Sequence, residues 1–99
     1  MAKYDVYPNP GGGGFLLDVQ ADLLDGLNTR AVVPLIPLQA APVPAKRLNP
    51  VFQIDGKPYV MATQFLAAVP ATILKTPLTN LAPQFSEITT AIDILIQGF

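Results

Sequence analysis

The 99-residue sequence contains no cysteine, no histidine and no tryptophan, and only 13% of its residues are charged. Without cysteine, the chain can form neither a disulfide framework nor a thiolate zinc site. Without histidine, it lacks the most common general base, the most common metal ligand and the side chain that titrates near neutral pH. Any catalysis would therefore depend on Asp, Glu, Lys, Arg, Tyr or Ser, and neither a metal ion nor another cofactor is expected.

Charge and hydropathy indicate which kind of partner the protein binds: nucleic acid, membrane or protein. Six basic and seven acidic residues give a net charge of −1, so the basic surface typical of a nucleic-acid-binding protein is not expected. Apolar residues make up 51% of the chain, which predicts exposed apolar surface facing a protein partner. No apolar run is long enough for a membrane span, and Met1–Asp5 lacks the layout of a signal peptide, so a cytoplasmic protein is expected.

Eleven prolines are spread along the chain and predict strands, turns and loops for its first four fifths. In Phe15–Leu24, apolar and polar residues alternate, which is typical of a half-buried strand. The other expected strands are Lys3–Tyr7, Arg30–Leu38, Val51–Ile54 and Tyr59–Thr63. In Phe15–Leu24 the buried face is expected to hold Leu17, Val19, Ala21 and Leu23, and the solvated face Asp18, Gln20 and Asp22.

Proline and glycine positions refine this assignment. Pro34 and Pro37 interrupt Arg30–Leu38, so this segment is predicted to be an edge strand or to bend. Asp55-Gly56 lies between two apolar runs and predicts a tight hairpin turn. Pro70 favours a short strand or a turn over a helix in Gln64–Leu74. Loops are expected at Gly11–Gly14, Gln39–Pro50 and Lys75–Leu81.

The hydrophobic period changes near the end of the chain and predicts one helix over Pro83–Ile96, ended by Gly98. Its apolar stripe is expected to be Phe85, Ile88, Ile92, Leu95 and Ile96. Ile94 lies outside the stripe and is either a core residue or part of an interface between two copies of the chain. The expected fold is therefore a single domain over residues 1–99, mainly β with antiparallel sheets and one C-terminal helix.

Few residues suggest chemistry. Asp18, Asp22 and Asp25 match no metal-binding signature and are interpreted as the solvated face of a strand. Arg30 with Asp25 is interpreted as a surface or interface ion pair, worth about 0–1 kcal/mol if exposed. Leu23 and Leu24 are neighbours and cannot both point into the core from one strand, so one of them is expected to be exposed unless a bulge occurs.

Several segments together resemble the CcdB family of toxins. They are Leu17–Asp25, Val33–Leu35, Pro50–Phe52, Met61–Thr63, Ala68–Pro70 and the terminal Ile92–Phe99. Their order and spacing match the family over nearly the whole chain. The resemblance implies a small SH3-like β-barrel of the CcdB/MazF type with a C-terminal helix.

The resemblance also implies a function. CcdB proteins are non-enzymatic toxins that act as homodimers, bind the A subunit of DNA gyrase and trap its cleaved-DNA intermediate. A CcdA-like antitoxin neutralises them, and the toxin–antitoxin complex represses its own operon through antitoxin contacts with operator DNA. Such modules maintain plasmids or reside in chromosomes, and no membrane is involved.

The family's gyrase-contacting positions correspond here to Leu23, Leu24, Asp93, Gln97, Gly98 and Phe99. The two leucines replace isoleucines, Asp93 replaces an asparagine, and Phe99 keeps an apolar terminus. Gln97 replaces a tryptophan, and glutamine cannot supply the apolar area of such an anchor. Two hypotheses stay open: a gyrase poison in which Phe99 is the aromatic anchor, or a dimer that binds antitoxin without poisoning gyrase. A third, a MazF-like ribonuclease using Arg30 and Asp25, is disfavoured by the few basic residues and the absence of histidine.

Overall fold

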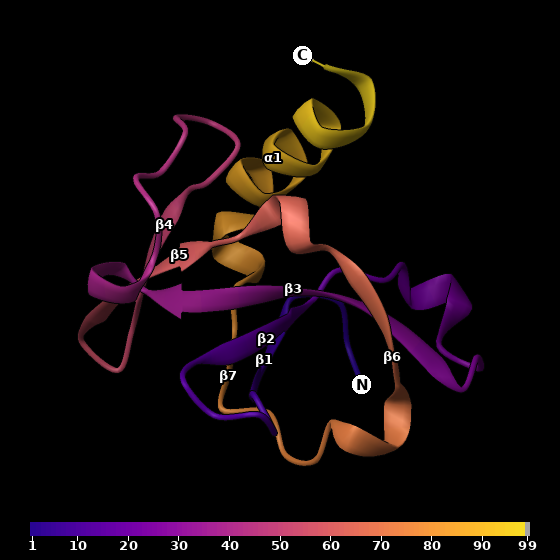
Figure 1. Ribbon diagram of the computed structural model, residues 1–99. Helices are drawn as coiled ribbons and strands as arrows, with labels where there is room; N and C mark the ends of the chain where they lie inside the picture. The colour runs from indigo at the N-terminus through magenta and orange to yellow at the C-terminus, as the bar shows by residue number, and fades with distance from the viewer. Residues whose placement is uncertain (99) are drawn as a thin grey trace.

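One curved antiparallel sheet and one helix make up the computed structural model, which describes residues 1–98. The helix α1 spans Phe85–Gln97 and stands at one side of the sheet, which curls into a half-barrel (Figure 1). This architecture confirms the predicted β-barrel with a C-terminal helix. The strands are β1 (Asp5–Pro8), β2 (Phe15–Asp18), β3 (Thr29–Pro37), β4 (Val51–Ile54), β5 (Lys57–Met61), β6 (Ala67–Pro70) and β7 (Thr79–Asn80).

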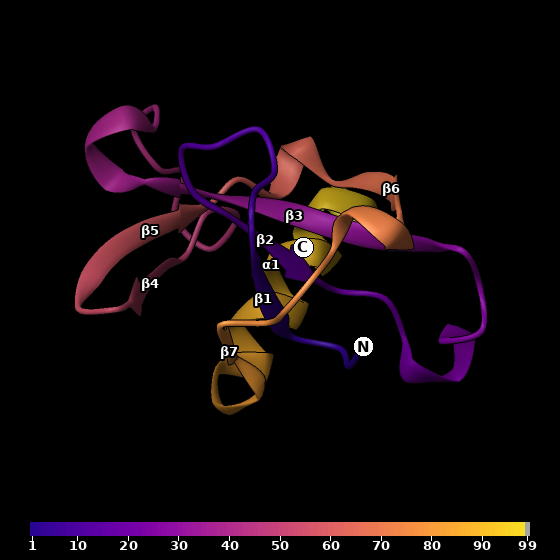
Figure 2. The same cartoon turned by 90° about the horizontal axis from the view of Figure 1, so that it is seen from below.

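The longest strand, β3, lies in the middle of the sheet. The hydrogen-bonded order is β4-β5-β3-β2-β1-β7, and β6 also pairs with β3 (Figures 1 and 2). The prediction of an edge strand over Arg30–Leu38 is therefore wrong. Pro34 is tolerated because it lies where β3 changes partner, between its pairing with β6 at Thr29–Val32 and with β5 at Leu35–Pro37. There its carbonyl still accepts a hydrogen bond from the Ala62 N–H at 2.9 Å.

Side chains alternate between two cores on the two faces of the sheet. The cross-strand neighbours Val6, Leu17 and Val33 are fully buried in the larger core, which α1 covers with Ile88. The opposite face carries a smaller core, formed by Tyr7, Leu16, Val32 and Leu74. Both faces of the inner strands are therefore occupied.

The second strand is shorter than predicted. It ends at Asp18, so only Leu17 of the expected apolar face is fully buried, whereas Ala21 and Leu23 are exposed. The assignment of the polar face is also wrong at two positions, because Asp18 and Gln20 are 0% and 8% exposed. The Asp18 carboxylate accepts the Gln20 N–H at 3.0 Å, a local bond at the point where the strand ends.

The turn and loop predictions are largely confirmed. Asp55 and Gly56 join β4 to β5 with φ values of 55° and 77°, the positive pair that a tight hairpin needs. β6 is the short strand expected within Gln64–Leu74. The loop expected over Lys75–Leu81 contains one short strand, β7, which pairs with β1.

The helix begins later than predicted and buries a narrower stripe. A 3₁₀ turn over Ala82–Gln84 contains Pro83, and α1 follows it. Ile88 is buried, as predicted, and Ile92 packs against the same core. Phe85 and Ile96 are 58% and 67% exposed, because the sheet covers only the middle of the helix.

Gly98 ends α1, as predicted. Gly98 has a φ of 84°, and its N–H donates to the Ile94 carbonyl at 2.9 Å. With 13 residues, α1 is too short to cross a bilayer, and no other helix within residues 1–98 has the length and apolar character to do so.

Candidate functional site

The loop from β2 to β3 presents two leucines to solvent. Asp22–Leu24 form a short 3₁₀ turn, labelled η1, in which no residue is buried. Leu23 is 94% exposed and Leu24 is 47% exposed. The sequence predicted one exposed leucine, and both are exposed because the strand has already ended at Asp18.

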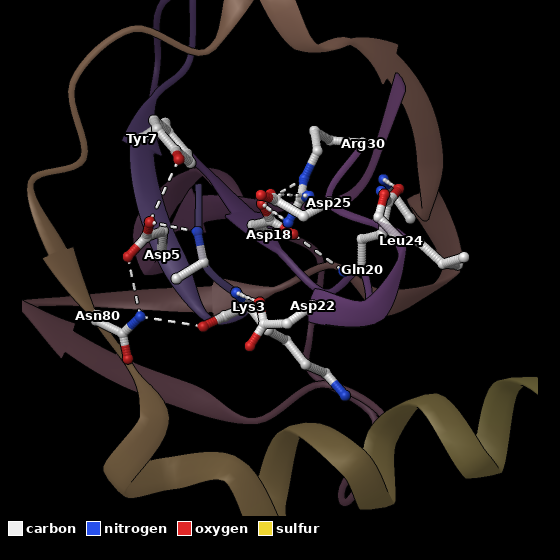
Figure 3. A network of polar contacts seen from close by, with 12 residues as sticks. Lys3, Asp5, Tyr7, Asp18, Gln20, Asp22, Leu24, Asp25, Arg30 and Asn80 are labelled. Atoms are coloured by element: carbon white, nitrogen blue, oxygen red, sulfur yellow. Dashed lines mark hydrogen bonds and ion pairs between the residues drawn. The ribbon is translucent and has the colours of Figure 1, made fainter. Parts of the chain in front are cut away.

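One buried amide fixes this turn to the sheet. The Gln20 Nε2 donates to the carbonyl of Leu24 at 2.9 Å, and the Gln20 Oε1 accepts the N–H of Ala31, in β3, at 3.0 Å (Figure 3). A single side chain thereby satisfies one backbone group of the loop and one of the central strand. The backbone of Leu24 is held in place although its side chain is in solvent.

A fully buried ion pair lies beside the turn. The Arg30 Nε donates to the Asp18 Oδ2 at 2.8 Å, and the Arg30 Nη2 lies 2.7 Å from the same oxygen. The Arg30 Nη1 donates to the Asp25 Oδ1 at 3.1 Å, and the Asp25 side chain is 57% exposed. The predicted ion pair between Arg30 and Asp25 is present. Its placement at the surface is wrong for Arg30, since the Arg30 side chain is 0% exposed and its closer partner is Asp18.

The environment of Asp18 opposes its ionisation. Burial raises the pKa of the Asp18 carboxyl above its ordinary value, while the Gln20 N–H and the Arg30 guanidinium lower it. Removing both charges from water costs free energy of folding. Hydrogen bonds to both carboxylate oxygens of Asp18 offset this cost.

The N-terminal segment holds the turn from another side. The Asp22 Oδ1 accepts the Lys3 N–H at 2.8 Å. The Asn80 Nδ2 in turn donates to the Lys3 carbonyl at 3.1 Å and to the Asp5 Oδ1 at 2.9 Å (Figure 3). The loop is therefore tied to β3 through Gln20 and Arg30 and, by way of Lys3, to Asn80 in β7, which makes the exposed leucines a preorganised apolar surface.

The other predicted site residues lie at the C-terminal end of α1. Asp93, Gln97 and Gly98 are all exposed, beside the exposed Ile96. Phe99 lies outside the described residues. In both Figure 1 and Figure 2, η1 and this end of α1 lie apart. The chain therefore presents the site residues as two separate surfaces, one on η1 and one on α1.

Sequence reasoning missed the residues that support the η1 surface. Gln20 and Asp18 were assigned to a solvated strand face, and Arg30 to the surface. A signal was present: Asp18 follows Phe15-Leu16-Leu17 and Arg30 precedes Ala31-Val32-Val33, so each charge adjoins a run that must be buried. Two opposite charges in such positions are buried only when paired.

The described residues hold no metal site. No three Asp or Glu carboxylates within residues 1–98 are grouped so that they could hold an ion. Asp18 at the end of β2, and Asp22 and Asp25 in the loop after it, instead accept hydrogen bonds from Gln20, Lys3 and Arg30. The chemistry offered here is apolar contact and shape.

The comparison with known families agrees with this architecture. The sequence model of the CcdB protein family matches residues 3–98, almost the full length of the chain. The match includes both surfaces and the polar network beneath η1. The chain belongs to the CcdB family and is a toxin of a toxin–antitoxin system.

Proposed function

We propose that this protein binds the A subunit of DNA gyrase and traps the enzyme on cleaved DNA, acting by contact and not by catalysis. The proposed contact residues are Leu23, Leu24, Asp93, Gln97, Gly98 and Phe99. The observation that carries the proposal is the 94% exposure of Leu23 on a turn that hydrogen bonds of the buried Gln20 side chain tie to the sheet. An exposed apolar side chain on a rigid support loses little conformational entropy on binding, which favours a protein-docking role.

We infer that the active form is a homodimer. The η1 surface and the α1 surface lie apart in one chain, so a single copy does not present one continuous contact area. A symmetric dimer duplicates each surface and can bring the α1 surfaces of two copies together. We further propose that a CcdA-like antitoxin neutralises the dimer in the cytoplasm, and that operator DNA is contacted through the antitoxin alone.

The test is a gyrase cleavage assay. Purified protein is incubated with gyrase from the presumed host, supercoiled plasmid and ATP, and linear DNA is scored. Leu23→Asp is expected to abolish linear product while the far-ultraviolet circular dichroism stays unchanged, because Leu23 packs against nothing in the core. Val43→Asp is the matched control, since Val43 is equally exposed, at 93%, in a different loop.

The α1 surface is tested in the same assay by deleting Gly98-Phe99. Loss of linear product with the deletion, and its retention in Val43→Asp, supports poisoning through this end. No linear product from the unaltered protein, at concentrations well above that of gyrase, contradicts the proposal. That result favours the second hypothesis, a dimer that binds antitoxin without poisoning gyrase, which the replacement of tryptophan by Gln97 already suggests.

A ribonuclease of the MazF type is disfavoured by the position of Arg30. A catalytic cation must reach the substrate phosphate, and the Arg30 side chain is 0% exposed and bound to Asp18. Incubation of the purified protein with RNA is expected to leave the RNA intact. Cleavage that disappears in both Arg30→Ala and Asp25→Ala would overturn this assignment.

A further inference from the structure

A cleft of about 420 Å³ separates the loop 41–50 from the first turns of α1. In Figure 1 this loop rises beside the helix, at the opposite side of the molecule from η1. A volume of this order suits a small molecule. The cleft lies outside the proposed gyrase-contacting surfaces, so binding of a ligand there does not depend on gyrase poisoning. Its polar lining consists of Lys46, Arg47 and Asn49 from the loop, and Ser86, Glu87 and Thr90 from the helix.

A buried amide holds the loop wall of the cleft in place. Asn49 is only 7% exposed, and its Nδ2 donates to the Met61 carbonyl at 3.0 Å and to the Gln64 Oε1 at 2.8 Å. Its Oδ1 accepts the Ala45 N–H at 3.1 Å, which closes a turn around Lys46. The backbone that carries the basic side chains of this wall is therefore fixed before a ligand binds, and this lowers the entropic cost of binding.

Charges of opposite sign line the two walls without pairing. Lys46 and Arg47 belong to the loop, and Glu87 belongs to the helix. The ion pairs found within residues 1–98 both involve Arg30, so these three charges do not pair with each other across the cleft. The space between the walls therefore leaves room for a ligand that presents a negative group to the loop and hydrogen-bond donors to the helix.

The hydrogen-bonding groups of the lining narrow the chemistry of this ligand. Lys46 and Arg47 only donate, and both are suited to a phosphate group. The ionised carboxylate of Glu87 only accepts, and it repels a second anionic group, whereas sugar hydroxyls donate to such carboxylates. The hydroxyls of Ser86 and Thr90 both donate and accept. The lining therefore matches a molecule with one phosphate and several hydroxyl groups.

The same lining disfavours larger phosphate-containing ligands. Within residues 1–98, no aromatic side chain lines the cleft, so the base of a nucleotide has no ring to stack on. A nucleic-acid backbone presents successive phosphates, of which two cations neutralise few, and Glu87 repels the others. A sugar ring needs only the hydrogen bonds that the helix wall offers. These observations favour a free sugar phosphate over a nucleotide or a nucleic acid.

We propose that the cleft between the loop 41–50 and α1 binds a small phosphorylated sugar. The phosphate accepts charge-assisted hydrogen bonds from Lys46 and Arg47. The sugar hydroxyls donate to Glu87 and exchange hydrogen bonds with Ser86 and Thr90. A ligand bound in this way joins the loop to the helix and stabilises the folded protein by mass action.

The test is isothermal titration calorimetry of the full chain at low ionic strength, with ribose 5-phosphate, inorganic phosphate and AMP as probes. Ribose 5-phosphate is expected to bind with a Kd about tenfold lower than that of inorganic phosphate, because only the sugar donates to Glu87. AMP is expected to bind no more tightly than ribose 5-phosphate. Equal Kd values for ribose 5-phosphate and inorganic phosphate would show binding of an anion alone and overturn the proposal. Tighter binding of AMP, or no binding of ribose 5-phosphate, would also overturn it.

Two variants with the same change in net charge test the basic wall. Lys46→Gln/Arg47→Gln removes both cations of the cleft, and Lys57→Gln/Lys75→Gln removes two exposed lysines outside it. The cleft variant is expected to raise the Kd for ribose 5-phosphate about tenfold or more, and the control to leave it within about twofold. Equal losses in the two variants would show unspecific attraction of an anion and would contradict the proposed site.

Glu87→Gln tests the acidic wall separately. The variant should bind inorganic phosphate more tightly, because the repulsion is removed, and its preference for ribose 5-phosphate should fall to about twofold or less. An unchanged preference would show that the sugar does not reach Glu87. In the unaltered protein, amide resonances of Lys46–Asn49, Ser86 and Thr90 should shift when ribose 5-phosphate is added, a result that depends on no variant. Shifts confined to other residues would place the ligand elsewhere and overturn the proposal.

Discussion

At the scale of the residue, Arg30 and Asp18 determine how the loop from β2 to β3 is held. Burial of an ion pair carries a desolvation penalty of several kcal/mol per ion, and a hydrophobic pair of similar volume is often as stable. The ion pair instead fixes the position of the loop. Arg30 reaches from Asp18, at the end of β2, to Asp25, beyond η1, so that one guanidinium spans the loop that presents Leu23.

We predict that Arg30→Met destabilises the protein by about 3–5 kcal/mol, because it leaves the Asp18 carboxylate buried without a cation. Urea unfolding at fixed protein concentration measures the change. Asp18→Asn/Arg30→Met should recover part of the loss, since asparagine carries no charge and still accepts the Gln20 N–H. Asp25→Asn, at the exposed partner, should cost no more than about 1 kcal/mol. An Arg30→Met variant as stable as Asp25→Asn would contradict this account.

Tyr7 makes the stability depend on pH in the alkaline range. Burial and the nearby carboxylates of Asp5 and Asp18 raise the pKa of the Tyr7 phenol from 10.0 to about 12. Above pH 10 the unfolded chain loses this proton while the folded protein keeps it. Stability should therefore fall as pH rises from about 10 to about 12, by roughly 2 kcal/mol in total.

The measurement is urea unfolding of the unaltered protein and of Tyr7→Phe at several pH values between about 9 and about 12. The variant lacks the phenol, so its decline should be smaller, and the difference between the two curves isolates Tyr7 from the lysines. Parallel curves would show that the Tyr7 phenol ionises equally in the folded and unfolded states. Tyr7→Phe should also cost little below about pH 9, because the hydrogen bond to Asp5 is long, at 3.3 Å.

At the scale of the element, the sequence predicted the structure well where one or two neighbouring residues determine the backbone conformation. Asp55-Gly56 specifies its hairpin through two positive φ values, and Gly98 ends the helix in the same way. The edge strand predicted from Pro34 was wrong. The effect of a proline depends on which strands pair beside it, and contacts between residues distant in sequence determine that pairing. The candidate site was half predictable. One exposed leucine followed from Leu23 and Leu24 being neighbours, although Leu23 itself was expected on the buried face. The burial of Asp18 depends on Arg30, twelve residues away.

Gly14 is the glycine on which the start of β2 depends. It has a φ of 154°, and a Cβ there would collide with the backbone carbonyl of Leu35 in the neighbouring strand. We predict that Gly14→Ala costs about 2 kcal/mol or more, because both strands would have to separate. Gly12→Ala is the control. It has a φ of 81° in open space and should cost only about 1–2 kcal/mol of backbone strain. Thermal unfolding compares the two, and equal losses would mean that the close approach of β2 and β3 imposes no cost.

At the scale of the whole molecule, the chain leaves much apolar surface without a partner. Leu23, Phe65, Phe85 and Ile96 are each more than half exposed, on a protein with few charges. The C-terminal half of α1 contributes strongly to this surface. Ile94 and Leu95 are half-buried and pack against neither core, which favours an interface role for Ile94 over a core role. The proposed homodimer would cover the side of the helix that carries Ile94 and Leu95 and leave the exposed Asp93 and Gln97 free to contact gyrase.

We therefore predict that stability depends on protein concentration. Dimerisation coupled to folding raises the unfolding midpoint by mass action as the concentration rises, and sedimentation equilibrium should give twice the chain mass of 10.5 kDa. Ile94→Asp should yield a monomer whose midpoint is independent of concentration, because a carboxylate would be desolvated in the interface. Val43→Asp, an exposed site on another loop, should remain dimeric. If Ile94→Asp sediments as a dimer, the two copies do not meet through Ile94, and this assignment of the interface is wrong.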